Sequence, residues 1–247
     1  MPATPAWPPK SAPRLFVADE LRAGATVRIE GNPAHYLSRV MRAAPGDIVI
    51  LCDDITGEWA ARVSDVGKRD VTLEVAEQLR MREAVPDLWL CPALLKKDRF
   101  DLILEKATEL GAARIQPMLT RRCVADKLNL DRARAITIEA AEQCARTALP
   151  EVAETVKLDA LLACWPDNRT LFFADENGGE PAAAAFIGHV GAAAILTGPE
   201  GGFDDAERAA IRAHPQAHAI SLGPRILRGE TAAIAAISVW MASAGDW

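Results

Sequence analysis

The stretch Leu196-Thr-Gly-Pro-Glu-Gly-Gly-Phe203 decides the fold class, because it joins a predicted buried strand to a predicted helix through three glycines and a proline. Residues 192–197 predict the strand. Residues 204–214 predict the helix, with Asp204 and Glu207 at the spacing of a capping box. Ligands of open α/β sheets bind beyond the carboxyl ends of strands, where such glycine loops let the backbone approach closely. Taken alone, the loop also fits a tight turn without a ligand.

A second loop, Ser221-Leu-Gly-Pro-Arg-Ile-Leu-Arg-Gly-Glu-Thr-Ala232, also follows a predicted strand (218–222) and leads into a predicted helix (231–244). Apolar side chains beside backbone polar groups suit an adenine, and arginines suit an anion or a polarised carbonyl. A solvated loop with a local arginine–glutamate pair is the alternative. Neither loop has the glycine spacing of a dinucleotide or phosphate-binding motif, so the sequence does not indicate NAD or ATP chemistry.

Two regions of different periodicity surround these loops. From residue 87 onward strands alternate with helices, which predicts an α/β domain with a mainly parallel sheet. The expected strands there are 87–95, 113–119 and 170–174, and the expected helices are 98–110 and 129–148. The earlier part predicts short strands at 25–30, 47–53, 58–63 and 70–76 with one helix near 33–42, which suits a small β-barrel. We therefore expect a loose tail over 1–13, a barrel domain over 14–82 and an α/β domain over 86–247.

Composition limits the function classes. The net charge is −6, but residues 148–247 carry 6 basic and 13 acidic side chains, so an RNA contact is expected within residues 1–147. The apolar stretch 181–197 is too short for a membrane span, and residues 1–13 lack the pattern of a signal peptide, so we expect a cytoplasmic protein without membrane contact. His214 and His218 have no acidic or thiol neighbour, and we expect no metal site.

Several segments, taken in order, carry a family resemblance. They are Glu105-Lys-Ala-Thr-Glu-Leu-Gly-Ala112, the glycine loop at 198–202 and the arginine loop at 222–232, together with Arg14-Leu-Phe16, residues 35–47 and Glu139-Ala-Ala-Glu-Gln-Cys144. The combination resembles the RsmE-type 16S ribosomal RNA (uracil-N3)-methyltransferases of the SPOUT superfamily. Residues 1–13 and 151–190 match nothing in the pattern, and Met41 stands where leucine is expected.

The resemblance implies a fold and a cofactor. It implies a SPOUT domain tied in a trefoil knot, which is an exception to the rule that chains do not thread their own loops, preceded by a PUA-like barrel. The knotted loops would bind S-adenosylmethionine. The residues that would do so are Leu196, Thr197, Gly198, Gly201, Gly202, Leu222, Gly223, Ile226, Leu227, Thr231 and Ala232. The family forms homodimers through the last helix, where Ile234, Ile237 and Met241 make an apolar stripe; burial within one subunit is the alternative.

The resemblance also implies a mechanism. Uracil N3 must lose its proton, and a guanidinium can stabilise the charge that develops on O2 and O4. We expect Arg228 in this role, with Glu200 or Glu230 taking the proton or orienting the arginine; Glu200 could instead cap the following helix. The partner would be 16S ribosomal RNA or the small ribosomal subunit. The expected RNA contacts are Arg14, Arg39, Arg42, Lys96, Lys97, Arg99, Arg121 and Arg122, each of which could also be a solvated surface charge.

Two other functions stay open at this point. The same fold could methylate a ribose 2′-hydroxyl or a transfer RNA, although the matched N-terminal barrel favours 16S RNA. A non-catalytic RNA-binding assembly factor is the alternative of another class, and the intact loops argue against it.

Overall fold

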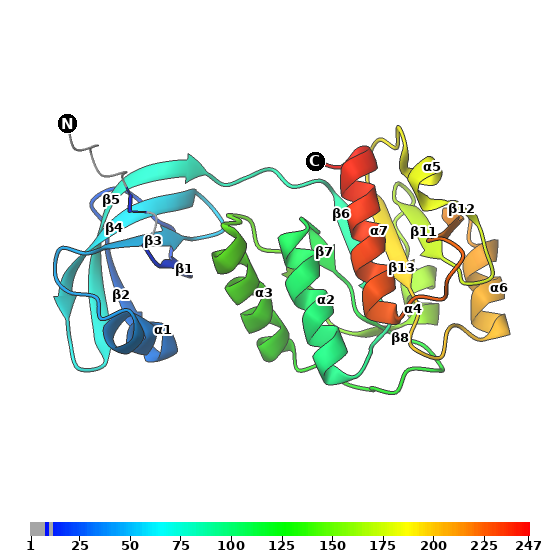
Figure 1. Cartoon of the computed structure of the whole chain (residues 1–247), viewed down its shortest axis with the longest axis horizontal. Coiled ribbons are helices and arrows are strands. Elements are labelled where there is room, and N and C mark those ends of the chain that lie inside the picture. The colour runs from blue at the N-terminus through cyan, green and yellow to red at the C-terminus, as the bar shows by residue number, and fades with distance from the viewer. Residues whose placement is uncertain (1–7, 10–11) are drawn as a thin grey trace. The chain divides into compact units, whose positions relative to one another are not determined.

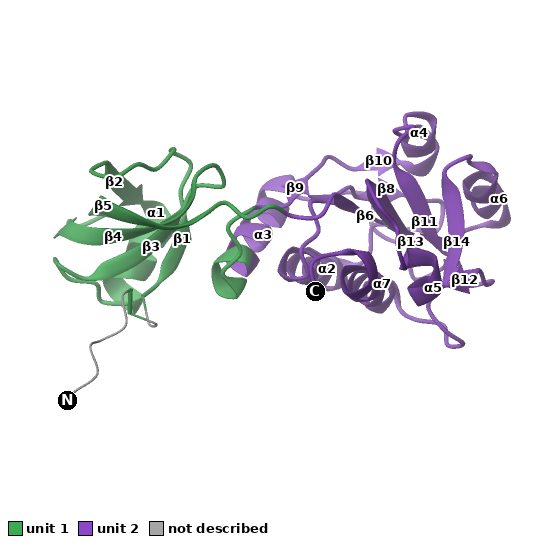
Figure 2. Ribbon diagram, turned by 90° about the horizontal axis from the view of Figure 1, so that it is seen from above, with its two compact units in different colours: residues 1–84, 141–148 green, residues 85–140, 149–247 purple. Residues whose placement is uncertain are grey.

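The computed structural model describes residues 8, 9 and 12–247, and the chain divides into two compact units (Figure 2). Unit 1 comprises residues 1–84 with 141–148, and unit 2 comprises residues 85–140 with 149–247. The expected tail over 1–13 lies largely outside the described residues. The expected division at 82–86 stays a prediction, because residues 141–148 group with unit 1.

Unit 1 is built on a curled five-stranded sheet in the order β1-β3-β4-β5-β2, which forms a half-barrel (Figure 1). The pairing of β1 with β3 is parallel and the other pairings are antiparallel. Alternating residues of β5, such as Val71, Leu73 and Val75, are buried on one face, as their spacing predicts. The elements are β1 (Arg14–Phe16), β2 (Thr26–Glu30), α1 (Gly31–His35), a π-helix (Tyr36–Val40), β3 (Ile48–Cys52), β4 (Gly57–Val66) and β5 (Asp70–Met81).

Unit 2 contains a seven-stranded sheet in the order β12-β14-β11-β13-β6-β7-β9, and all its pairings are parallel. A separate parallel pair joins β8 (Met118–Leu119) to β10 (Val156–Lys157). The strands of the large sheet are β6 (Leu88–Pro92), β7 (Arg114–Ile115), β9 (Glu151–Val152), β11 (Thr170–Ala174), β12 (Glu180–Pro181), β13 (Ala193–Thr197) and β14 (Ala217–Ser221).

Helices cover both faces of this sheet (Figure 2). Ala193 and Ile195 of β13 pack into the core that α2 and α7 complete, whereas Ala194 and Leu196 pack into a second core on the opposite face. A strand buried on both faces explains why β13 is apolar throughout. The helices are α2 (Lys97–Glu109), α3 (Leu130–Cys144), α4 (Leu158–Ala163), α5 (Ala182–Phe186), α6 (Asp205–Ala213) and α7 (Gly229–Ala244).

The connections around β11 place three loops together. Strand β11 lies between β13 and β14, so the connection through α6 crosses it, and α7 then returns to pack beside α2 (Figure 1). Loops that follow β11, β13 and β14 consequently meet at one edge of the sheet. The trefoil knot that the resemblance implies stays a prediction.

The largest differences between the structure and the sequence predictions are in three places. The predicted strand 113–119 is two short strands in different sheets, separated by Gln116 and Pro117. The helix predicted to reach residue 148 ends at Cys144, because Ala145 has a left-handed φ of 62° and the Glu83 carboxylate accepts hydrogen bonds from the following amides. Residues 151–190, where little was predicted, form α4, α5 and three short strands besides β11.

Over the part of the chain that the structure describes, every helix is too short or too polar to cross a membrane.

Candidate active site

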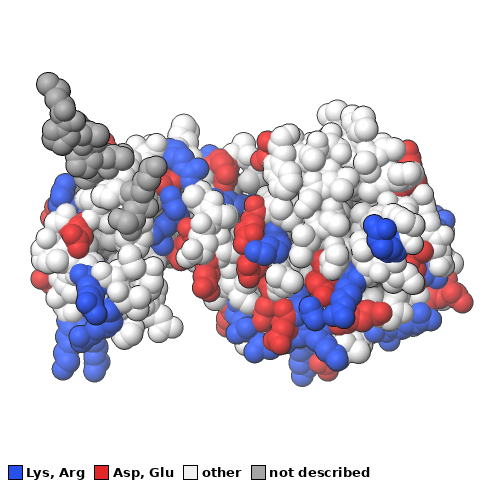
Figure 3. All heavy atoms as spheres, in the orientation of Figure 1, with Lys and Arg blue, Asp and Glu red and all other residues white. Residues whose placement is uncertain are grey.

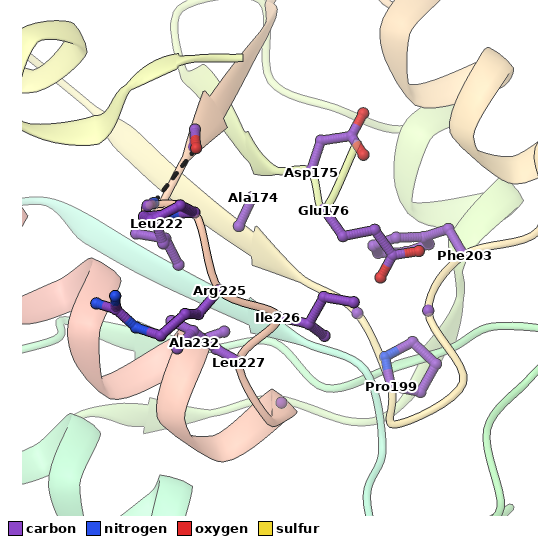
Figure 4. A pocket seen from close by; sticks show the side chains of 16 residues that line it. Ala174, Asp175, Glu176, Pro199, Phe203, Leu222, Arg225, Ile226, Leu227 and Ala232 are labelled. Carbon is purple, nitrogen blue, oxygen red and sulfur yellow. Dashed lines mark hydrogen bonds between the residues drawn. The ribbon is translucent and has the colours of Figure 1, made fainter. Parts of the chain in front are cut away.

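A pocket opens at the carboxyl ends of β11, β13 and β14, and the glycine and arginine loops both line it (Figure 4). The two loops, separated in the sequence by α6 and β14, therefore enclose one cavity. The turn after β11 supplies a third wall. The lining residues are Ala174, Asp175, Glu176, Gly198, Pro199, Gly202, Phe203, Ser221, Leu222, Gly223, Pro224, Arg225, Ile226, Leu227, Gly229 and Ala232.

Glycines form the parts of this pocket where a side chain has no room. A Cβ at Gly198 would lie 2.8 Å from the Phe203 ring. A Cβ at Gly202, whose φ is +66°, would lie 2.5 Å from Glu176 Oε1. At Gly229 it would lie 3.0 Å from the carbonyl oxygen of Gly198. Backbone from two loops thus forms a close cradle beside Leu222 and Leu227, which suits a flat heteroaromatic ring.

Asp175 anchors the third wall of the pocket. Its carboxylate is fully buried and accepts hydrogen bonds from Arg208 Nε at 3.1 Å and from Arg212 Nε at 2.8 Å. The Asn177 amide donates to the same carboxylate at 2.9 Å, which closes the turn. Because these donors occupy both oxygens, we assign Asp175 to holding the turn in place rather than to contacting a ligand.

Glu176 and Arg225 are the other charged side chains of the pocket lining, and Figure 4 shows their charged groups at well-separated points around the pocket. Glu176 Oε1 accepts a hydrogen bond from Arg208 at 2.8 Å, while Oε2 has no hydrogen bond to the described residues. Glu176 can accept a hydrogen bond from a sugar hydroxyl or an ammonium group, and Arg225 can bind a carboxylate. The pocket therefore suits a positively charged ligand that carries an amino acid and a sugar.

Seven of the eleven predicted cofactor residues line the pocket, namely Gly198, Gly202, Leu222, Gly223, Ile226, Leu227 and Ala232. The other four lie beside it. Leu196 and Thr197 are buried in β13, Thr231 is exposed on α7, and Gly201 accepts a hydrogen bond from Arg122 Nη1 at 2.9 Å.

The three predicted catalytic residues lie outside the lining. Arg228 is exposed and is the N-cap residue of α7, next to the lining residues Leu227 and Gly229. Glu230 is 4% exposed and pairs with Arg99 at 3.1 Å. Glu200 is exposed, and the alternative that it caps the following helix is wrong: Asp204 is the N-cap of α6 and forms a full capping box with Glu207, as the spacing predicted.

The predicted RNA-contact residues fall into two groups. Arg39, Arg42, Lys96 and Lys97 are exposed and make no ion pair with the described residues. The others have partners. Arg14 pairs with Glu58 at 2.8 Å and its side chain is only 18% exposed, so it stabilises the half-barrel. Arg121 pairs with Asp204 at 2.8 Å, and Arg122 binds the Gly201 carbonyl, so the two arginines hold the glycine loop.

Sequence reasoning missed the acidic wall at Asp175 and Glu176. The signal was present, since two acids directly follow the strand predicted at 170–174, but that region matched no family segment. Arg225 was noted in its loop without a specific role. The described residues contain no group of three histidine, cysteine or acidic side chains placed to hold a metal ion.

Family models match both regions of the chain. An RNA methyltransferase domain matches residues 82–241, and an RNA methyltransferase PUA domain matches residues 29–76. Ribosomal RNA small subunit methyltransferase E of Rickettsia conorii is 30% identical, over 91% of this chain and 93% of its own length. The Synechocystis protein of the same name is 33% identical, over 91% of this chain and 76% of its own length.

Solved structures agree with these matches. Ribosomal RNA small subunit methyltransferase E from Neisseria gonorrhoeae, bound to S-adenosyl methionine, superimposes with a TM-score of 0.87 at 29% identity, covering 95% of this chain and 99% of that one. A Legionella pneumophila protein in complex with the bound cofactor SAM gives 0.86 at 29% identity, covering 96% and 99%. The fold and the pocket are those of an RNA methyltransferase. The chain belongs to the family of the ribosomal RNA small subunit methyltransferases E, and the resemblance seen in the sequence is confirmed.

Proposed function

We propose that this protein transfers a methyl group from S-adenosylmethionine to N3 of a uridine in the 16S ribosomal RNA of the small ribosomal subunit. The observation that carries the proposal is the single pocket enclosed by the glycine and arginine loops, in a chain of this RNA methyltransferase family. The same pocket argues against a non-catalytic assembly factor, because its backbone cradle is intact.

The residues of the pocket fit the cofactor. The cradle of Gly198, Gly202 and Gly229 excludes side chains, and Leu222 and Leu227 offer apolar contacts to an adenine. We assign Arg225 to the cofactor carboxylate and keep the predicted cofactor residues as the binding set. When bound, S-adenosylmethionine supplies a methyl group that its sulfonium has already activated.

The chain's own task is to place and deprotonate N3 of the uracil. The base must leave any pairing or stacking before N3 can meet the methyl group in line. Arg228 is exposed and lies in the chain between the lining residues Leu227 and Gly229, and its guanidinium makes no ion pair with the described residues. We assign it to stabilising the charge on O2 and O4. Glu230 is buried and pairs with Arg99 rather than with Arg228, so we assign it to positioning Arg99 instead of removing the proton. Exposed Glu200 stays the candidate proton acceptor.

RNA contact is assigned to the exposed cations Arg39 and Arg42 of unit 1 and Lys96 and Lys97 of unit 2, which make no ion pair with the described residues. A homodimer through α7 also belongs to the proposal. Most of the predicted stripe is buried within one chain, since Ile237 and Met241 are 0% exposed, so Ile234 and its neighbours on the outer face would form the contact. A cytoplasmic location remains a prediction.

The test compares two arginines of one loop. Small subunits that lack the modification are incubated with radiolabelled cofactor, and the labelled base is mapped. Arg228→Ala should lower methyl transfer at least about 100-fold, the range for loss of one oxyanion donor, while calorimetry shows nearly unchanged cofactor binding. Arg225→Ala should weaken cofactor binding instead. Equal losses of transfer and binding in Arg228→Ala would assign it to the cofactor. Label on a ribose of the small-subunit RNA, or on transfer RNA supplied in a parallel reaction, would overturn the uridine N3 assignment.

A further inference from the structure

A second cavity, of about 220 Å³, lies in unit 2 between the first turns of α2 and α3 and the segment that joins β8 to α3. Its volume exceeds the roughly 150 Å³ of an apolar protein cavity that holds a benzene ring. The cavity is therefore large enough for a flat six-membered ring. Its lining residues are Leu94, Leu95, Lys97, Phe100, Asp101, Ala125, Lys127, Leu128, Asn129, Arg132 and Ala133.

The floor of this cavity is apolar and its rim is positively charged. Leu94, Leu95 and Phe100 are 1–2% exposed and belong to the main core of unit 2. Lys97 and Lys127 are exposed at the rim, and neither forms an ion pair with any residue that the structure describes. Figure 3 shows lysine and arginine side chains gathered, with acidic ones among them, over the lower end of α2.

The remaining charges of the cavity compensate each other. Arg132 Nη2 pairs with Asp101 Oδ2 at 2.6 Å, so this pair adds no net charge. Asn129 Oδ1 accepts a hydrogen bond from the Arg132 amide at 3.0 Å. Among the lining residues, the two lysines therefore leave a net charge of +2. A ligand with a flat ring, whose face can pack on apolar side chains, and with a phosphate complements these features, and a nucleotide has both.

The cavity adjoins the candidate active site. A Cβ at Gly229, which lines the cofactor pocket, would lie 3.1 Å from both methyl carbons of Leu95, which lines the second cavity. Two residues after Lys97, Arg99 pairs with Glu230 in the first turn of α7. Leu95, which lines the second cavity, therefore packs against a residue that lines the cofactor pocket, so the two cavities are neighbours within unit 2.

We propose that this second cavity binds a nucleotide of the substrate RNA that flanks the target uridine. This inference rests on the proposed function, since it takes RNA as the substrate. The base or ribose lies against Leu94, Leu95 and Leu128, and the phosphate lies between Lys97 and Lys127. The site holds the strand in register while its neighbour enters the cofactor pocket.

The first test measures RNA affinity without cofactor. Binding of a fluorescent 16S RNA transcript is followed by anisotropy for Lys97→Ala, Lys127→Ala and the control Lys106→Ala. Lys106 lies on the same helix but pairs with Glu105 at 2.7 Å and with Glu109 at 2.8 Å. Each cavity variant should weaken binding roughly three- to tenfold and lower the slope of log Kd against log salt by about one. Cavity variants that behave like the control would overturn the proposal.

The second test fills the cavity without changing its charge. Ala133 is 1% exposed and lines the cavity, so Ala133→Leu places a larger side chain in it; Ala125→Leu does the same from the joining segment if the first variant fails to fold. A filled but folded variant should raise KM for the RNA roughly tenfold with cofactor binding unchanged. If the filled variant binds RNA as tightly as the wild type, Lys97 and Lys127 are ordinary surface charges and the proposal is wrong. Failure of the proposed function would show separately, as an absence of heat when wild-type protein is titrated with S-adenosylmethionine.

Discussion

Replacing Asp175 by asparagine should destabilise unit 2 and loosen the wall of the cofactor pocket. The Asp175 side chain is 0% exposed and pairs with Arg208, which is 13% exposed, and with Arg212, which is 45% exposed. Removal of one partner of a buried ion pair costs about 3–5 kcal/mol, and the half-exposed Arg212 pair contributes less. We therefore expect a loss of about 3 kcal/mol in the free energy of unfolding. For a domain of this size that lowers Tm by about 6–12 °C.

Differential scanning calorimetry of the whole chain measures this loss, and Asp205→Asn is the matched control. Asp205 lies on α6 and contacts the same Arg208 at 3.5 Å, but its side chain is fully exposed, so its removal should leave Tm within about 1 °C. Titration with S-adenosylmethionine should show weaker binding only for Asp175→Asn, because the turn it holds lines the pocket. Equal Tm values for the two variants would refute the reasoning.

Three further predictions concern a glycine, a carboxylate and the thiols. Gly202→Ala should cost about 1–2 kcal/mol and weaken cofactor binding, because an L residue is strained at φ +66° and its Cβ would meet Glu176; unchanged calorimetric affinity would contradict this. Burial opposes ionisation of Asp53, but hydrogen bonds from Leu21, Thr56, Ile55 and Gly57 outweigh it and lower its pKa below 3.8. The ionised form therefore stabilises unit 1 above about pH 4, and the stability gap between wild type and Asp53→Asn in urea melts should close as pH falls through the lowered pKa. Burial raises the pKa of Cys52 and of Cys91 to about 12, so a thiol reagent at pH 8 should label exposed Cys144 and Cys164 quickly and reach Cys52 and Cys91 only after denaturation.

Local patterns predicted most of the elements near the site. The strand at 170–174 has the predicted bounds, and the capping box of Asp204 and Glu207 forms as its spacing indicates. These features depend on neighbouring residues, whose periodicity and capping chemistry are visible in the sequence. Local patterns also predicted that both ligand loops directly follow strands, and these strands end at Thr197 and Ser221.

Long-range pairing decided what the local pattern could not. Arg14 was expected on the RNA, but Glu58, forty-four positions away, takes its guanidinium. Glu230, a candidate base, is buried and pairs with Arg99. Asp175 and Glu176, which follow β11, line the pocket because β11 lies between β13 and β14 in the sheet. The order of the strands determines which loops meet, and hydrophobic periodicity carries no information about that order. The sequence therefore defined the fold class and the two ligand loops, whereas the tertiary structure decided which charges stay free to act and which ones neutralise each other.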